Sequence, residues 1–125
     1  MMKPAKTLCI IGSVLLLVMA AFHGSGYAFV TEAILESNAE DFLKQIVPAL
    51  FVHPSIHLVG LAAFGILALF LKQANKVLIL LAILVIADAA LAFYLGGVLP
   101  GVMLLATASS FAVAGYLYSA REVAA

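Results

Sequence analysis

Charged residues are scarce in this chain, cysteine occurs once and tryptophan is absent. Of its 125 residues only 10% are Asp, Glu, Lys or Arg, and the six basic and six acidic side chains cancel to a formal charge of zero. A soluble domain of this size needs far more polar side chains to cover its surface. Because 66% of the residues are hydrophobic, we expect an integral membrane protein surrounded by lipid.

These scarcities also exclude several functions. A nucleic-acid-binding surface needs clustered positive charge to displace phosphate counterions, and the few basic residues are dispersed. The single cysteine, Cys9, excludes an internal disulfide and a four-cysteine zinc site. Cys9 also lies a helix length away from every histidine along the predicted spans, which disfavours nucleophilic catalysis. A non-catalytic protein is therefore favoured over an enzyme.

Four long apolar runs lie between the charged clusters, at about 7–28, 52–71, 76–95 and 98–119. Each is near the length that crosses a hydrocarbon core of ~30 Å. In a bilayer each backbone amide must bond within its own element, so runs of this kind are helices. Short connections make consecutive helices antiparallel. The sequence thus predicts an all-α membrane protein, a four-transmembrane-helix antiparallel bundle formed by one domain of residues 1–125.

The basic residues predict the orientation, because Lys and Arg that flank a span are retained in the cytoplasm. Five of the six basic residues fall on one side if the N-terminus is inside, namely Lys3, Lys6, Lys72, Lys76 and Arg121. We expect the plasma (inner) membrane of a bacterial-type cell, with both termini cytoplasmic. The acidic loop, residues 29–50, is then outside.

The first apolar run has a second interpretation. Lys3 and Lys6, followed by an apolar stretch and then small residues, also describe a secretory signal peptide that is cleaved after Ala20 or Ala28. Retention of the span is favoured, because the apolar stretch continues through Val30. Cleavage would also leave three helices whose termini lie on opposite sides of the membrane.

An additional outer amphipathic surface helix is predicted at about 31–47. Glu32, Glu36, Glu40 and Lys44 recur every four residues on one face, and apolar residues occupy the other. Such a helix would lie on the outer membrane surface.

The start of the second span depends on two prolines. Pro48 ends the surface helix or begins the next segment, and His53 before Pro54 is predicted to cap the N-terminus of the span. If the helix instead begins at Ala49, Pro54 lies inside it and would kink it.

One acidic residue, Asp88, lies near the centre of the third span, where an ionisable group costs about 2.5–3.5 kcal/mol on insertion scales. Equal rise along antiparallel helices places it level with Thr107, with Ser110 about one turn away. This placement allows two interpretations. Asp88 is either hydrogen-bonded to one of these hydroxyls and holds helices together, or it handles protons or cations.

The three histidines all fall toward the outer end of the predicted spans. His53 and His57 have the i, i+4 spacing that places two side chains on one helix face, and His23 should lie at a similar depth on the first span. The same count places His57 only slightly farther out than Asp88, so the histidines and Asp88 form a predicted polar column. Four roles are open: interfacial side chains with no ligand, ligands of a b-type haem, ligands of zinc or copper, or a proton relay with Asp88.

The last span carries a stripe of small residues, Ala106, Ser110 and Ala114, which lets another helix approach closely. That helix belongs either to the same chain or to a second copy, so the partners considered are the lipid bilayer, a homo-oligomer and a larger membrane complex. The favoured function is a non-catalytic accessory or assembly subunit with a buried His/Asp column. The alternatives are a proton-linked small-solute transporter that uses Asp88, and a haem- or metal-binding redox protein that uses the histidines.

Overall fold

The computed structural model describes residues 3–124, in which every regular element is a helix. The helices are α1 (Lys3–Ser25), α2 (Tyr27–Glu36), α3 (Asp41–Ala68), α4 (Ala74–Leu95) and α5 (Val98–Ala124). Four helical stretches of this described part are long and apolar enough to cross a membrane: Lys3–Glu36, Asp41–Ala68, Ala74–Leu95 and Val98–Ala120. The predictions of an all-helical chain and of four helices of spanning length are confirmed.

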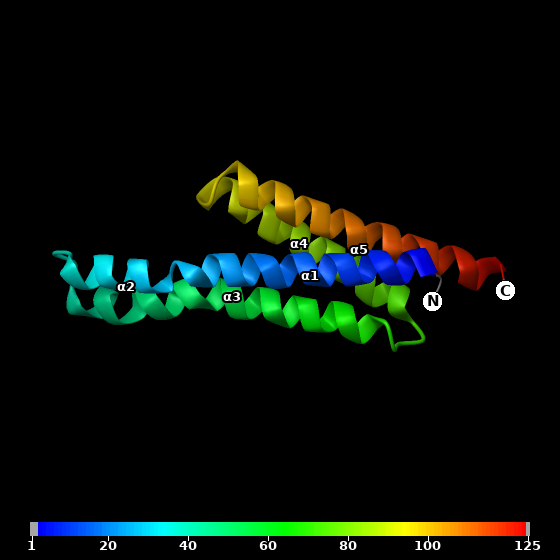
Figure 1. Cartoon of the computed structure of the whole chain (residues 1–125), viewed down its shortest axis with the longest axis horizontal. Coiled ribbons are helices and arrows are strands. Elements are labelled where there is room, and N and C mark those ends of the chain that lie inside the picture. The colour runs from blue at the N-terminus through cyan, green and yellow to red at the C-terminus, as the bar shows by residue number, and fades with distance from the viewer. Residues whose placement is uncertain (1–2, 125) are drawn as a thin grey trace.

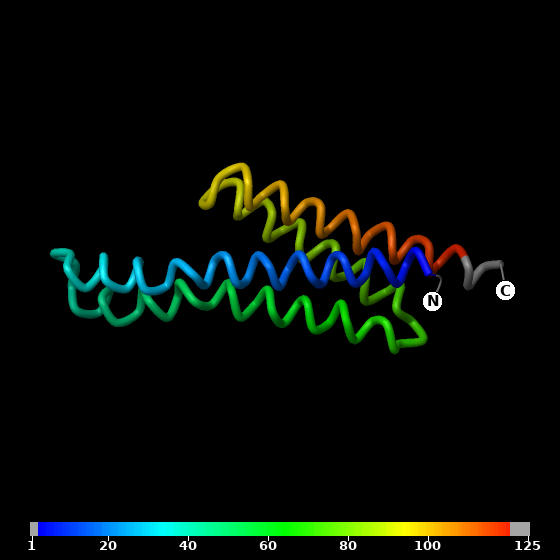
Figure 2. Tube along the Cα trace, in the orientation of Figure 1, coloured from blue at the N-terminus to red at the C-terminus, as the bar shows by residue number. Residues whose placement is uncertain are grey.

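The helices form two hairpins. α1 and α2 continue in nearly one direction and lie along α3, while α4 and α5 make the second hairpin (Figure 1). α1 packs against both α3 and α5 and joins the hairpins, whereas α3 and α4 contact each other less. At the end opposite to the termini the hairpins diverge, and α2 with the beginning of α3 extends beyond the α4–α5 turn (Figure 2).

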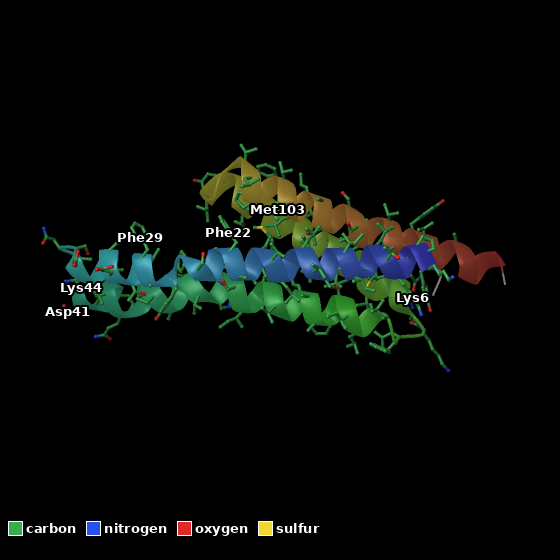
Figure 3. All side chains as sticks on the ribbon, viewed as in Figure 1. Lys6, Phe22, Phe29, Asp41, Lys44 and Met103 are labelled. Atoms are coloured by element: carbon green, nitrogen blue, oxygen red, sulfur yellow. The ribbon has the colours of Figure 1, made fainter. Side chains whose placement is uncertain are left out.

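The charged clusters lie at the two ends of this arrangement. Lys6 is at the end that holds both termini and the α3–α4 turn, whereas Asp41 and Lys44 are at the opposite end, where α2 turns into α3 (Figure 3).

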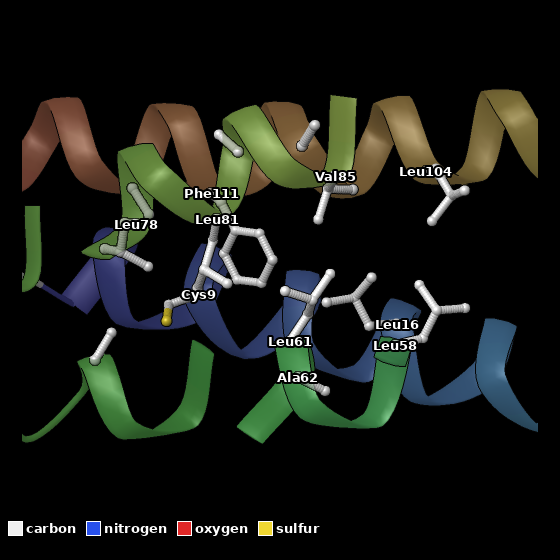
Figure 4. Packing of buried hydrophobic residues seen from close by; sticks show 14 of the residues in the cluster. Cys9, Leu16, Leu58, Leu61, Ala62, Leu78, Leu81, Val85, Leu104 and Phe111 are labelled. Atoms are coloured by element: carbon white, nitrogen blue, oxygen red, sulfur yellow. The ribbon is translucent and has the colours of Figure 1, made fainter. Parts of the chain in front are cut away.

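Phe111 of α5 is the largest fully buried side chain, and it lies at the junction of α1, α3 and α5 (Figure 4). Two glycines make room for its ring: a β-carbon at Gly12 would lie 2.9 Å from the ring, and one at Gly65 would lie 3.0 Å from it. The Cys9 thiol also donates a hydrogen bond to the Gly65 carbonyl, with sulfur and oxygen 2.9 Å apart. Glycine at these positions therefore lets the two hairpins approach closely.

The predicted surface helix at 31–47 is wrong, because the chain leaves the helix in the middle of this range. α2 ends at Glu36, and the next helix begins at Asp41. Ser37 is extended (φ −75°, ψ 166°), and its hydroxyl donates to the Ile34 carbonyl at 2.7 Å and accepts from the Ala39 amide at 3.2 Å. A serine followed by asparagine favours such a local turn. The apolar and acidic residues are instead divided between two antiparallel helices.

The predicted capping of the second span by His53 is also wrong. α3 begins twelve positions earlier, at Asp41, and continues through both Pro48 and Pro54. Each proline lacks the amide that would bond to the carbonyl four residues before it. Helices packed against neighbours tolerate this loss, and α3 packs along α1 and α2.

The small-residue stripe of α5 has one end inside the bundle and one end outside it. Ala114 is buried, while Ala106 is exposed. The stripe therefore contributes to packing within this chain at Ala114 but not at Ala106.

Candidate functional site

All three histidines and Asp88 line one cleft, at the end where the two hairpins diverge. Its volume is about 670 Å³, which is within the range of small-molecule sites. Apolar side chains from α1, α3, α4 and α5 form most of the lining, including Phe22, Phe51, Leu91 and Leu104.

The polar centre of the cleft is a contact between α3 and α4. His57 Nε2 and Asp88 Oδ2 are 3.2 Å apart, a hydrogen bond that becomes an ion pair when the imidazole carries a proton. The side chains are 41% and 22% exposed, so both are reachable from the cleft. The sequence placed these two groups at similar depth along their helices, and in the structure they are in contact. Because α3 and α4 belong to different hairpins, the pair links the two halves of the protein.

His23 of α1 is held by α3. Its Nδ1 is 3.2 Å from the Ser55 hydroxyl oxygen, and its ring stacks on Phe51 with centroids 4.5 Å apart and planes at 25°. A β-carbon at Gly24 would lie 3.3 Å from the same serine oxygen, so glycine here keeps the helices close. Neither partner of His23 was predicted from the sequence. The available signal was the i, i+4 spacing of Phe51 and Ser55, which places both side chains on the face of α3 that meets His23.

The histidines do not converge on one point. Among the described side chains there is no group of three or more His, Cys, Asp and Glu residues that could hold a metal ion. His53 is exposed at the edge of the cleft, while His23 and His57 are each hydrogen-bonded to a different partner. The predicted zinc or copper site is therefore not supported. Haem ligation by His23 and His57 would have to use the second ring nitrogen of each, Nε2 of His23 and Nδ1 of His57, because the first is hydrogen-bonded.

The predicted hydroxyl partners of Asp88 bond elsewhere. The Thr107 hydroxyl donates to the Met103 carbonyl at 3.0 Å, and the Ser110 hydroxyl donates to the Ala106 carbonyl at 2.9 Å. Serine and threonine in a helix commonly satisfy themselves in this way, through the carbonyl four residues earlier. The position of a residue along its helix thus did not predict the partner of Asp88. The sequence does not show how each helix is rotated about its axis, and this rotation determines which side chains meet.

The polar side chains that line the cleft include the three histidines and Asp88, which offer hydrogen bonds and sites for proton exchange. Cys9 is fully buried elsewhere, against Gly65, and does not reach the cleft. The arrangement thus combines a largely apolar cavity with one polar pair that has a donor and an acceptor. Neither a protein family, nor a curated protein, nor a solved structure matches this chain.

Proposed function

We propose that this chain is a small, non-catalytic integral membrane protein that binds a neutral amphiphilic molecule in the cleft between its hairpins. The observation that carries the proposal is the cleft itself, whose lining is apolar apart from a few polar groups centred on the His57–Asp88 pair. Such a lining suits a ligand with an apolar body and one polar group. The role of an accessory or assembly subunit, and its association with a larger membrane complex, remain predictions.

The polar pair indicates which kind of headgroup would fit. His57 and Asp88 satisfy each other at 3.2 Å, so a charged headgroup would have to compete with this contact for a partner of opposite charge. A hydroxyl or carbonyl group adds a hydrogen bond without adding charge. We therefore expect an uncharged headgroup, such as that of a long-chain alcohol.

The membrane placement rests on two features. Four helices have spanning length and composition, and the end with both termini carries Lys6, Lys72 of the α3–α4 turn and Lys76 at the start of α4. Basic residues favour the cytoplasmic side. The cleft then opens toward the outer half of the bilayer, where an amphiphile enters from the lipid.

Photolabelling with a diazirine-bearing hexadecanol in proteoliposomes tests the proposal. We expect peptide mass spectrometry to find the label on cleft residues such as Phe22 and Leu91. Leu91→Trp should reduce this labelling at least about fivefold, because the larger ring fills the cavity. The matched control is Ile86→Trp on the same helix, since Ile86 is 51% exposed and lies outside the cleft. Uniform labelling of all lipid-facing helices, unaffected by Leu91→Trp, would contradict a specific site.

A second candidate, a proton-linked carrier for small solutes, is favoured by one observation. The titratable pair bridges the two hairpins at an open cleft, and relative movement of two helical units around a central site is the usual mechanism of such carriers. This candidate predicts that Asp88→Asn abolishes solute uptake driven by a proton gradient in vesicles, while the helical content stays unchanged. Uptake that persists in the folded Asp88→Asn protein would contradict it.

A further inference from the structure

A second groove lies near the end of the molecule that holds the termini, between α4 and α5, with a volume of about 510 Å³. One end of it is polar. Asn75 and Lys76 come from the first turn of α4, and Ser119 comes from the last part of α5. Tyr116 also borders the groove and is 70% exposed, as is typical of aromatic rings at a membrane interface.

The other end of the groove is apolar and open. Ile79, Leu80 and Ile83 follow Lys76 over the next two turns of α4, and they are 42%, 56% and 58% exposed. On the α5 side Gly115 has no side chain, and a β-carbon there would lie only 3.1 Å from Ile79. The glycine therefore lets Ile79 lie closely against α5. The exposed side chains of α4 in this groove suit one flexible hydrocarbon chain that runs along the helix.

The polar end carries positive charge and an unused acceptor. Lys76 is exposed, and no acidic residue lines the groove. The Asn75 Oδ1 atom is buried and has no hydrogen-bond partner among the described residues. A buried acceptor of this kind gains from a donor supplied by a ligand. The polar end thus suits a headgroup that combines an anionic phosphate with a hydroxyl donor.

From this combination we propose that the α4–α5 groove binds an anionic phospholipid of the leaflet next to the α3–α4 turn. Its phosphate contacts Lys76, its headgroup hydroxyl donates to Asn75, and one acyl chain lies against Ile79, Leu80 and Ile83. The inference rests on the membrane placement proposed above, but it is independent of the ligand in the cleft.

The absence of tryptophan permits a direct test by fluorescence. Ile83→Trp places a single fluorophore at the apolar end of the groove, where brominated acyl chains quench it. The protein is reconstituted with brominated phosphatidylglycerol or brominated phosphatidylcholine, and the relative binding constant of the two lipids is measured. We expect an approximately fivefold preference for phosphatidylglycerol, which corresponds to ~1 kcal/mol for one lysine near an anionic headgroup.

Two further variants identify the residue responsible. Lys76→Gln should abolish most of the preference, whereas Lys72→Gln should leave it unchanged, because Lys72 lies in the adjacent turn and does not line the groove. An equal loss in both variants would overturn the site in favour of general surface charge. An absence of preference in the parent would overturn it as well. If neither lipid quenches the tryptophan, the membrane placement fails, whereas the photolabelling of the cleft reports on the proposed ligand separately.

Discussion

Replacement of Phe111 by alanine is expected to lower the free energy of unfolding by about 2–4 kcal/mol. The ring is fully buried, and it fills the space that Gly12 and Gly65 leave between the hairpins. In a membrane the unfolded helices stay in lipid, so little hydrophobic transfer energy is lost. The cost comes from the packing contacts missing around the new cavity, which places it at the lower end of the range known for such truncations.

Unfolding in mixed micelles, followed by circular dichroism as denaturing detergent is added, measures this loss. Phe64→Ala is the matched control, because Phe64 lies next to Gly65 on α3 but is 56% exposed. We expect its effect to stay within about 0.5 kcal/mol. Equal effects of the two truncations would show that Phe111 is not the packing centre of the bundle.

Replacement of His57 by alanine is expected to lower the free energy of unfolding by about 1–2 kcal/mol. The substitution removes the hydrogen-bond partner of Asp88, which is only 22% exposed and has no other side-chain partner among the described residues. The expected value stays at the lower end of the cost of an unsatisfied polar group, because Asp88 keeps some access to water through the cleft. The same micelle titration measures it.

A double-mutant cycle separates the pair from the two individual side chains. His57→Ala, Asp88→Ala and the double variant should show a coupling energy of about 0.5–2 kcal/mol. His53→Ala serves as the control, since His53 is exposed one turn away on the same helix. A coupling energy of zero would mean that the 3.2 Å contact does not hold the hairpins together. Asp88 would then be left with a role in binding or transport alone.

The main elements were predictable because they depend on local composition. Uninterrupted apolar runs predicted four helices of spanning length, which the structure contains. One error occurred where a local turn interrupts a stretch of residues that have helical spacing. The acidic residues between Glu32 and Lys44 have helical spacing, yet Ser37 satisfies the end of α2 with its own hydroxyl and breaks the pattern. Pro54 led to the opposite error, because it predicted the start of a helix. α3 instead continues through Pro54, where it is packed against neighbouring helices.

For the candidate site, the sequence predicted how far along each helix the residues lie, but not which neighbour each side chain meets. Counting residues along antiparallel helices placed His57 near the level of Asp88, and the two are in contact. The same count offered Thr107 and Ser110 as partners of Asp88, but each bonds to a carbonyl of its own helix. Residue counting gives the height of a side chain in the bundle, whereas the rotation of each helix determines which neighbour it meets.

The amino-acid sequence by itself determined the all-helical class, the four long apolar helices and the scarcity of catalytic groups. The scarcity follows from composition. The helices follow from the apolar runs and from the need to satisfy each backbone amide within its own element. Only the tertiary structure decided that the helices form two diverging hairpins, with Phe111 seated between glycines at their junction and His57 against Asp88 in the cleft. Those features depend on which helix faces meet. In a chain apolar on nearly every side, the hydrophobic pattern does not distinguish a face that meets a helix from one that meets lipid.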